Sequence, residues 1–153
     1  MQTMPADLPD RLEAGTHNMP GIAGLLEGIR FVSRTGTERI ARWERMLARR
    51  AAEGLRRMPE VEIFADEKGT AQSGVLSFRV KGMDCEQIGE ELARREIAVR
   101  AGLHCAPLAH RTAGTLETGT VRLSPSVFNT EMQIDVFLRE LGCILRENAK
   151  KSV

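Results

Sequence analysis

The strongest constraint on the fold is a long run of apolar residues that recur at three- and four-residue spacing between positions 37 and 58. The run consists of Ile40, Trp43, Leu47, Ala51, Leu55 and Met58. This spacing places the apolar side chains on one face of an α-helix, and Thr37 is a suitable N-cap for it. A second stripe follows the N-cap candidate Thr130 and consists of Ile134, Phe137, Leu138, Leu141 and Leu145. Two helices that are apolar on one face need a partner layer to cover that face.

Short segments typical of β-strands lie between these two helices. They are residues 61–64, 74–80, 97–100 and 120–124, each apolar or alternating and bounded by turn residues. Further helices are expected over residues 21–32 and after the N-cap candidate Asp84. This order predicts an α+β fold with a small, mostly antiparallel sheet of about four strands and helices packed on one side. The segment from residue 75 to residue 100 needs a right-handed crossover if its two strands are parallel.

The length and composition indicate one soluble globular domain. The chain has 153 residues, of which 42% are hydrophobic and 28% charged, which favours a folded core over disorder. Residues 1–20 contain Pro5, Pro9 and Pro20 and are expected to form an extended lead-in. Residues 21–153 are expected to form the single α+β domain. The net charge of +1 and the absence of a long apolar run argue against nucleic acid and membrane partners.

The cysteines indicate a reducing environment. The chain contains Cys85, Cys105 and Cys143, an odd number at wide spacing and without a CxxC pair. A disulfide framework and a structural zinc site are both poorly supported by this pattern, and no metal-ligand spacing emerges elsewhere. Reduced thiols in the cytoplasm fit the pattern best.

The helix expected after Thr37 is unusually basic. Eight arginines fall between Arg34 and Arg57, against three glutamates. This face could bind an acidic partner. The simpler interpretation is a solvated helix face whose arginine stems cover apolar surface, and the sequence favours it.

Cys105 is the main candidate for chemistry. It lies in Val-Arg-Ala-Gly-Leu-His-Cys-Ala-Pro at residues 99–107, where the chain leaves a strand, turns at Gly102 and reaches a loop or helix start. A loop held on a rigid strand can deliver a nucleophile into a cleft, and nearby positive charge favours the reactive thiolate. The alternative is an ordinary buried cysteine that acts as a small hydrophobe. Spacing alone favours that alternative, and the adjacent His104 is weak evidence against it.

Two arginines and one polar loop are candidates for ligand binding. Arg122 lies inside the strand-like segment 120–124, where its planar fork could bind a carboxylate or could face solvent from an edge strand. Arg100 has the same ambiguity. The polar residues 13–18 precede a helix and could hold a phosphate through backbone amides and the Thr16 hydroxyl, although a simple helix-entry loop is favoured.

Three segments, in order, resemble motifs of one enzyme family. Residues 11–16, Arg-Leu-Glu-Ala-Gly-Thr, are similar to an RxEAGT motif, and residues 99–106 are similar to a VRxGxHCA motif. Residues 121–124, Val-Arg-Leu-Ser, followed by Phe-Asn-Thr at 128–130, are similar to an RxSxxxYNT motif. These motifs belong to the class V aminotransferase fold and, within it, to the pyridoxal phosphate-dependent cysteine desulfurases. The resemblance implies the C-terminal small domain of a fold-type I pyridoxal phosphate enzyme.

The resemblance assigns roles to four residues and reverses the preference for a structural Cys105. Cys105 matches the thiolate that takes sulfur from L-cysteine and becomes a persulfide. Arg122 matches the arginine that binds the substrate carboxylate. Arg100 matches an arginine near the substrate, and His104 belongs to the same substrate-side motif. A sulfur-acceptor protein is a possible partner.

The resemblance also bears on the cofactor. Gly15 and Thr16 match a segment that reaches the cofactor phosphate of the neighbouring subunit in a homodimer. The family anchors pyridoxal phosphate on a lysine of a large domain, and none of the lysines here stands in a matching context; they are Lys68, Lys81, Lys150 and Lys151. We therefore expect the cofactor to bind only together with a large domain, and neither bound cofactor nor turnover for this chain alone. Pairing with a large domain, or self-association, is expected.

Two other functions remain open at this point. The chain could be a non-catalytic binding or assembly module that keeps the fold and pairs with itself or another protein. It could also be a domain of a related aminotransferase, selenocysteine lyase or sulfinate desulfinase. His17 and Pro125 depart from the family pattern.

Overall fold

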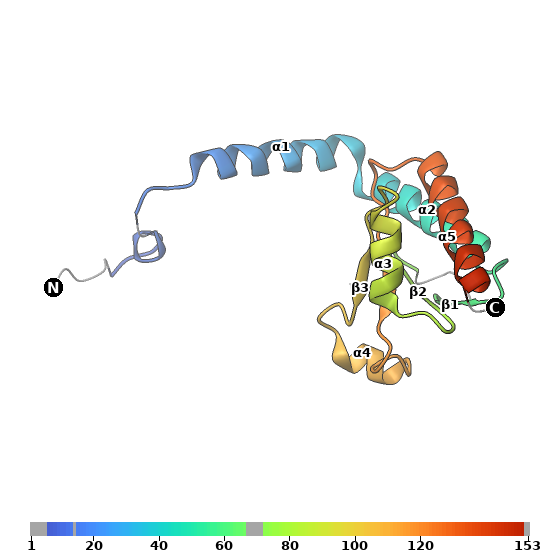
Figure 1. The fold of residues 1–153 in the computed structure, drawn as a ribbon. Helices are drawn as coiled ribbons and strands as arrows, with labels where there is room; N and C mark the ends of the chain where they lie inside the picture. The colour runs from blue at the N-terminus through green and yellow to red at the C-terminus, as the bar shows by residue number, and fades with distance from the viewer. Residues whose placement is uncertain (1–5, 14, 67–71, 152–153) are drawn as a thin grey trace. The chain divides into compact units, whose positions relative to one another are not determined.

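The computed structural model describes residues 6–13, 15–66 and 72–151. The chain divides into two compact units, Met1–Thr37 and Glu38–Val153, each described here by itself. The elements along the chain (Figure 1) are η1 Asp10–Leu12, α1 Met19–Thr35, α2 Thr37–Leu55, β1 Val61–Phe64, β2 Leu76–Val80, α3 Cys85–Ala93, β3 Arg100–Gly102, α4 Pro107–Thr112, β4 Thr120–Leu123 and α5 Glu131–Lys151.

The first unit holds the short 3₁₀ turn η1 and the helix α1. The Asn18 side chain caps α1 by accepting a hydrogen bond of 3.0 Å from the Gly21 amide, which satisfies one of the free N–H groups of the first turn. The helix therefore begins at Met19 rather than at the predicted residue 21. It ends at Gly36, whose φ of 84° is in the left-handed region that stops helices. The turn η1 was not predicted from the sequence.

The second unit is built on a four-stranded sheet in the order β1-β2-β4-β3. All three neighbouring pairs are antiparallel. Because β2 and β3 both run antiparallel to β4, they are parallel to each other, and α3 forms the crossover between them. The predicted α+β fold with a small, mostly antiparallel sheet is confirmed.

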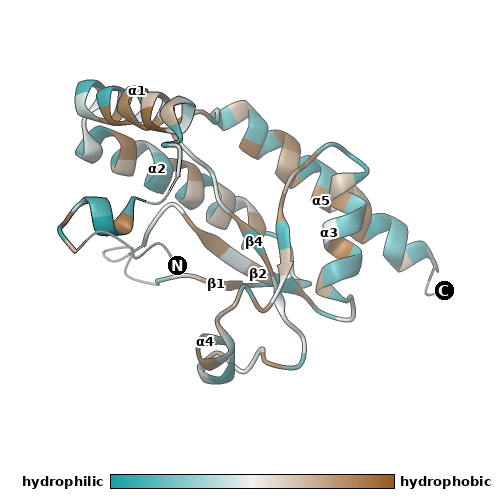
Figure 2. Ribbon diagram, turned by 90° about the vertical axis from the view of Figure 1, so that its left-hand side faces the viewer, coloured by the Kyte–Doolittle hydropathy of each residue, from teal (hydrophilic) through white to brown (hydrophobic). Residues whose placement is uncertain are grey.

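The core lies between one face of this sheet and the helices α2, α3 and α5, which Figure 2 shows together on one side. The largest buried side chains on this side are Leu47, Leu55, Leu76, Phe78, Ile88, Leu92, Val121, Phe137 and Leu141. The rings of Phe78 and Phe137 meet edge to face, with centroids 5.8 Å apart. Each such buried side chain contributes about 1.5–3 kcal/mol of hydrophobic stabilisation. Both predicted apolar stripes face this core, except that Ile40 is half-buried and lies outside the core cluster.

The predicted helix caps are confirmed for α3 and α5. The Asp84 carboxylate accepts a hydrogen bond of 2.8 Å from the Glu86 amide. At α5, the Thr130 hydroxyl accepts from the Gln133 amide at 3.3 Å, and the Gln133 side chain accepts from the Thr130 amide at 3.0 Å. This reciprocal pair is a capping box, and it fixes the start of α5 against the end of the sheet.

The structure corrects three boundaries. Strand β3 covers Arg100–Gly102 rather than residues 97–100, because Ile97 and Val99 pack against the core without joining the ladder. Helix α2 ends at Leu55 rather than residue 58, and β2 starts at Leu76 rather than residue 74. Helix α4 was not predicted, because its six residues are too few to show a helical period.

The other face of the sheet carries polar residues and α4. In β4, Val121 and Leu123 are buried in the core, so Arg122 between them points to the opposite face. The strand register places Arg122 opposite Ser77 of β2 and Arg100 of β3. Helix α4 lies on this side, where its residues and the sheet line a shallow, open pocket of about 170 Å³.

Candidate active site

Cys105 lies on a turn with an unusual backbone conformation. The chain leaves β3 at Gly102, which has a φ of 104°, and His104 and Cys105 follow with φ values of 52° and 58°. Residues other than glycine rarely adopt the left-handed region, and each costs on the order of 1–3 kcal/mol. The thiol of Cys105 is exposed, and α4 begins at Pro107. The turn therefore presents the thiol outward, as expected for a loop or helix start.

The His104 side chain fastens this turn to the sheet. Its Nε2 atom shares a hydrogen bond of 3.1 Å with the hydroxyl of Thr120, the buried first residue of β4. The His104 ring also lies against the ring of His110 on α4, with centroids 5.6 Å apart. His110 is itself held by a hydrogen bond of 2.8 Å between its Nδ1 atom and the Thr115 hydroxyl. Contacts of this kind repay backbone strain at the turn.

His104 is poised to stay neutral. Burial lowers the pKa of its imidazole, and the positive charge of Arg122, the nearby His110 and the positive charge of Arg100 lower the pKa further. Its Nδ1 atom is buried and has no hydrogen-bond partner among the described residues. A buried polar atom without a partner is uncommon in folded proteins.

Arg100 lies beside the thiol. Its Nη2 atom donates toward the Cys105 sulfur at 3.8 Å. A guanidinium is the kind of neighbour that stabilises a cysteine thiolate, which is the nucleophilic form. Arg100 is exposed and paired in register with Arg122, so two positive charges stand side by side at this end of the sheet.

Arg122 lies in a central strand, which excludes the solvent-facing edge position that the sequence left open. It is half-buried, and its Nε atom has no hydrogen-bond partner in the described part of the chain. An unpaired guanidinium in such a position is suited to bind a carboxylate through two parallel N–H donors. The arrangement thus combines an exposed thiol on the turn after β3 with the guanidinium of Arg122 on the neighbouring strand β4.

Gly15 and Thr16 belong to the first unit, whereas Arg100, His104, Cys105 and Arg122 come together in the second. Gly15 has a φ of 88°, and nothing lies within 4 Å of the position a Cβ would take. Its backbone is therefore open to an approaching anion. On either side of Gly15, the His17 Nε2 atom and the Glu13 Oε2 atom lie 3.5 Å apart.

The other two cysteines are in helices, as predicted. Cys85 is the buried first residue of α3, and burial raises the pKa of its thiol. Cys143 is half-buried in α5, with the Arg146 Nη2 atom 3.1 Å from its sulfur. All three cysteines are free thiols. The described residues contain no group of three or more His, Cys, Asp or Glu that could hold a metal ion.

Sequence reasoning missed Thr120, His110 and Thr115 as parts of the site. Thr120 reads as an ordinary strand residue, and His110 reads as an isolated histidine. Their roles arise from contacts across the fold, such as the pairing of His104 with a hydroxyl 16 positions away. The only local signal was the position of all three within 15 residues of Cys105.

Comparison with known proteins gives a consistent result. The sequence model of the family "Aminotransferase class-V" matches residues 2–137. The chain is 45% identical over 143 residues to a "Probable cysteine desulfurase" of Mycolicibacterium paratuberculosis, covering 92% of this chain and 20% of that protein. It is 35% identical over 131 residues to a "Probable cysteine desulfurase" of Pyrococcus abyssi, covering 85% of this chain and 32% of that protein.

Solved structures show the same relationship. An apo cysteine desulfurase from Thermococcus onnurineus NA1 matches with a TM-score of 0.79 and 36% identity, covering 95% of this chain and 34% of that one. The cysteine desulfurase CsdA from Escherichia coli matches with a TM-score of 0.79 and 30% identity, covering 90% of this chain and 33% of that one.

The chain spans between a fifth and a third of the length of these relatives. None of its described helices is both long and apolar enough to cross a membrane. The family match extends over most of the chain and includes both the Cys105 turn and Arg122. The chain therefore belongs to the class-V aminotransferase family.

Proposed function

We propose that this chain is the domain of a cysteine desulfurase-like enzyme that receives sulfur from L-cysteine on Cys105. The observation that carries the proposal is the placement of the exposed Cys105 thiol beside Arg100 of β3. Arg100 pairs in register with Arg122 of β4, whose Nε atom has no hydrogen-bond partner among the described residues. The two relatives and the two solved structures described above are cysteine desulfurases, which favours sulfur transfer over the other reactions of the family.

Each residue has a defined task in this proposal. The Arg122 fork binds the substrate carboxylate, and the guanidinium of Arg100 faces the Cys105 sulfur, which is the attacking atom. The thiolate attacks the substrate sulfur, so that an S–S bond forms while the C–S bond breaks and its electron pair stays with the carbon fragment. The sulfur then remains on Cys105 as a persulfide. Neutral His104 orients the turn that carries the thiol.

Pyridoxal phosphate, when bound, supplies the electron sink that weakens the C–S bond. The open backbone at Gly15 fits a phosphate, and the adjacent Thr16 hydroxyl can donate to one. We assign these two residues to the cofactor phosphate of a neighbouring subunit. The anchoring lysine comes from a large domain, because no lysine of this sequence stands in the family's motif. Alone, the chain neither binds the cofactor covalently nor turns over.

We expect the enzyme to act in the cytoplasm, because three widely spaced cysteines without a CxxC pair suit a reducing compartment. A homodimer would bring Gly15 and Thr16 to the partner's cofactor. Light scattering over a range of concentrations tests the association, and a clean monomer in the presence of the large domain would count against it.

A domain exchange tests the proposal directly. This chain would replace the matching 143 residues of the mycobacterial relative, and sulfide release from L-cysteine would be measured with a reductant. We expect the exchanged enzyme to be active, the Cys105→Ser version to bind cofactor but release no sulfide, and the isolated chain to be inactive. Sulfide release by the isolated chain, or full activity of the Cys105→Ser version, would overturn the proposal.

A further inference from the structure

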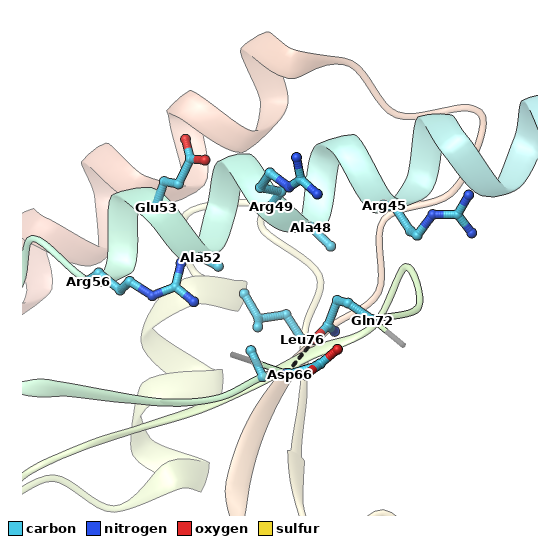
Figure 3. A pocket seen from close by; sticks show the side chains of 10 residues that line it. Arg45, Ala48, Arg49, Ala52, Glu53, Arg56, Asp66, Gln72 and Leu76 are labelled. Atoms are coloured by element: carbon cyan, nitrogen blue, oxygen red, sulfur yellow. Dashed lines mark hydrogen bonds between the residues drawn. The ribbon is translucent and has the colours of Figure 1, made fainter. Parts of the chain in front are cut away.

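The surface hollow beside α2 does not select a ligand. Figure 3 shows that Arg45, Arg49 and Arg56 share this hollow with the carboxylates of Glu53 and Asp66, so its charge is mixed. The three arginines are exposed and the alanines of α2 in the lining are buried. This agrees with the solvated basic face that the sequence favoured. The packing beneath the Cys105 turn is tighter and more specific.

Helix α3 lies against β3 at small residues (Figure 1). A Cβ atom on Gly89 would lie 3.2 Å from the Ala101 Cβ atom, so a larger side chain does not fit between helix and strand without a shift. One turn earlier, Cys85 begins α3. Burial raises the pKa of the Cys85 thiol, and the Gly102 backbone, which faces that sulfur, acts against the rise. The first residue of α3 thus meets the last residue of β3.

Gly119 completes this contact from the segment that leads into β4. It precedes Thr120, the cross-strand partner of Gly102, and has a φ of 61°. A Cβ atom at position 119 would lie 2.8 Å from the Cys85 sulfur, 3.2 Å from the Gly102 Cα atom and 3.3 Å from the Gly102 carbonyl carbon. The first distance is shorter than a non-bonded contact allows, and the other two atoms belong to the backbone. A side chain at position 119 therefore displaces the end of β3.

The two anchors of the Cys105 turn meet at Gly119 and Thr120. The turn begins at Gly102, which lies against Gly119, and it is fastened by the hydrogen bond between His104 and Thr120. Between these anchors the backbone is in the left-handed region, a conformation that persists only where the surroundings hold it. A shift of the Gly102 backbone changes the distance that the strained residues must span.

We propose that Gly119 and Cys85 are positioning residues for the Cys105 turn. The missing side chain of Gly119 lets the Gly102 backbone lie against the Cys85 sulfur, and this contact fixes where the Cys105 thiol stands beside Arg100. The importance of that placement for sulfur transfer rests on the proposed function. The positioning itself rests on the contacts alone and can be measured in the full chain without any reaction.

The test compares two glycines that lie between α4 and β4. Gly114 has a φ of 67°, and nothing lies within 4 Å of the position of its Cβ atom. Gly114→Ala therefore adds backbone strain without a contact, whereas Gly119→Ala adds both. Hydrogen exchange is measured at the Ala106 amide, which donates to the Leu103 carbonyl at 2.9 Å within the turn. Amides of α5 report global opening, and circular dichroism checks that each variant folds.

We expect Gly119→Ala to speed exchange at Ala106 about tenfold more than Gly114→Ala does, because overpacking adds to the backbone strain. Cys85→Ala removes the sulfur that meets the new Cβ atom. The double variant should therefore exchange within about threefold of Cys85→Ala alone, as coupled neighbours do. If Gly119→Ala does not fold, the same comparison of the double variant with Cys85→Ala decides.

Three results would overturn the proposal. The first is equal exchange at Ala106 in Gly114→Ala and Gly119→Ala. The second is faster exchange in α5 by the same factor as at Ala106, which would indicate a loss of overall stability and no specific effect on the turn. The third is the absence of rescue by Cys85→Ala, including a double variant that does not fold.

Sulfide release in the exchanged enzyme separates this inference from the proposed function. An inactive exchanged enzyme with Gly119 in place refutes the proposed function and leaves the result at Ala106 as it stands. In an active exchanged enzyme, Gly119→Ala should lower kcat about tenfold, because small misplacements of a reacting group are costly, and Cys85→Ala should restore much of it. Equal kcat in the Gly114→Ala and Gly119→Ala enzymes would contradict the positioning role.

Discussion

The hydrogen bond between His104 and Thr120 should control the turn that carries Cys105, and replacing Thr120 with valine tests this. Valine keeps the shape of threonine but puts a methyl group where the hydroxyl meets His104 Nε2 at 3.1 Å. Thr120 is only 3% exposed, which limits the access of water to that side. The His104 Nδ1 atom already lacks a hydrogen-bond partner among the described residues. In the Thr120→Val variant, the His104 Nε2 atom loses its hydrogen-bond partner as well.

The expected loss follows from two limits. A net hydrogen bond contributes about 0.5–1.5 kcal/mol, and a buried polar group left unpaired costs about 1–3 kcal/mol. If the turn relaxes out of the left-handed region, the release of backbone strain caps the loss. We therefore expect the free energy of unfolding to fall by about 1–2 kcal/mol, which lowers the melting temperature by roughly 3–6 °C for a chain of this size.

Urea unfolding measures the stability, and hydrogen exchange over residues 103–106 measures the turn. Thr118→Val is the matched control, because the exposed Thr118 hydroxyl donates only to the neighbouring Gly119 carbonyl at 3.2 Å. That change should stay within about 0.5 kcal/mol. If Thr120→Val costs no more than Thr118→Val and exchange at the turn is unchanged, the hydrogen bond does not hold Cys105 in place.

Three further outcomes are expected. His104 binds a proton less readily in the folded chain than in the unfolded chain, because its folded pKa lies below the usual 6.5. The neutral imidazole therefore contributes fully to the free energy of unfolding above pH 6.5, and this contribution is lost as the pH falls from 6.5 through the folded pKa. Urea unfolding at several pH values should show a weaker acid dependence in His104→Gln, and an unchanged dependence would contradict the assignment. Leu141→Ala removes a fully buried side chain of α5 and should cost about 2–5 kcal/mol by the same measurement, so a cost below 1 kcal/mol would contradict the described core. Arg100→Ala should slow alkylation of Cys105 near neutral pH with no change at Cys143, and equal rates before and after would show that Arg100 does not activate the thiol.

The sequence predicted the parts of the fold that are encoded locally. The apolar stripes of α2 and α5 have a helical period, and the cap at Asp84 needs only its own next residues. Strand β3 was predicted too early in the chain because Ile97 is apolar and packs half-buried against the core without pairing. Packing alone does not distinguish a paired strand from a packed loop. The orientation of Arg122 needed the strand order, which shows that β4 is central.

The candidate site was predictable in part for the same reason. Cys105 and Arg122 stand in motifs that are visible in the sequence, so the family resemblance identified them. The contact of His104 with Thr120 and the approach of His104 to His110 depend on how the turn folds back onto β4 and α4. Periodicity and motif spacing carry no information about such contacts, and only the structure brings them together.

The account depends most on Cys105 being an activated thiol in this chain. Limited alkylation with iodoacetamide near neutral pH, followed by peptide mass spectrometry, compares it with Cys85 and Cys143 in one sample. Cys105 is exposed and has Arg100 at 3.8 Å from its sulfur, and Cys85 is buried with a raised thiol pKa. Cys143 also has an arginine, Arg146, at 3.1 Å from its sulfur, but it is half-buried. We predict that Cys105 is modified first and that Arg100→Ala removes part of its advantage. Modification of Cys143 at the same rate as Cys105 in the folded chain would contradict the account.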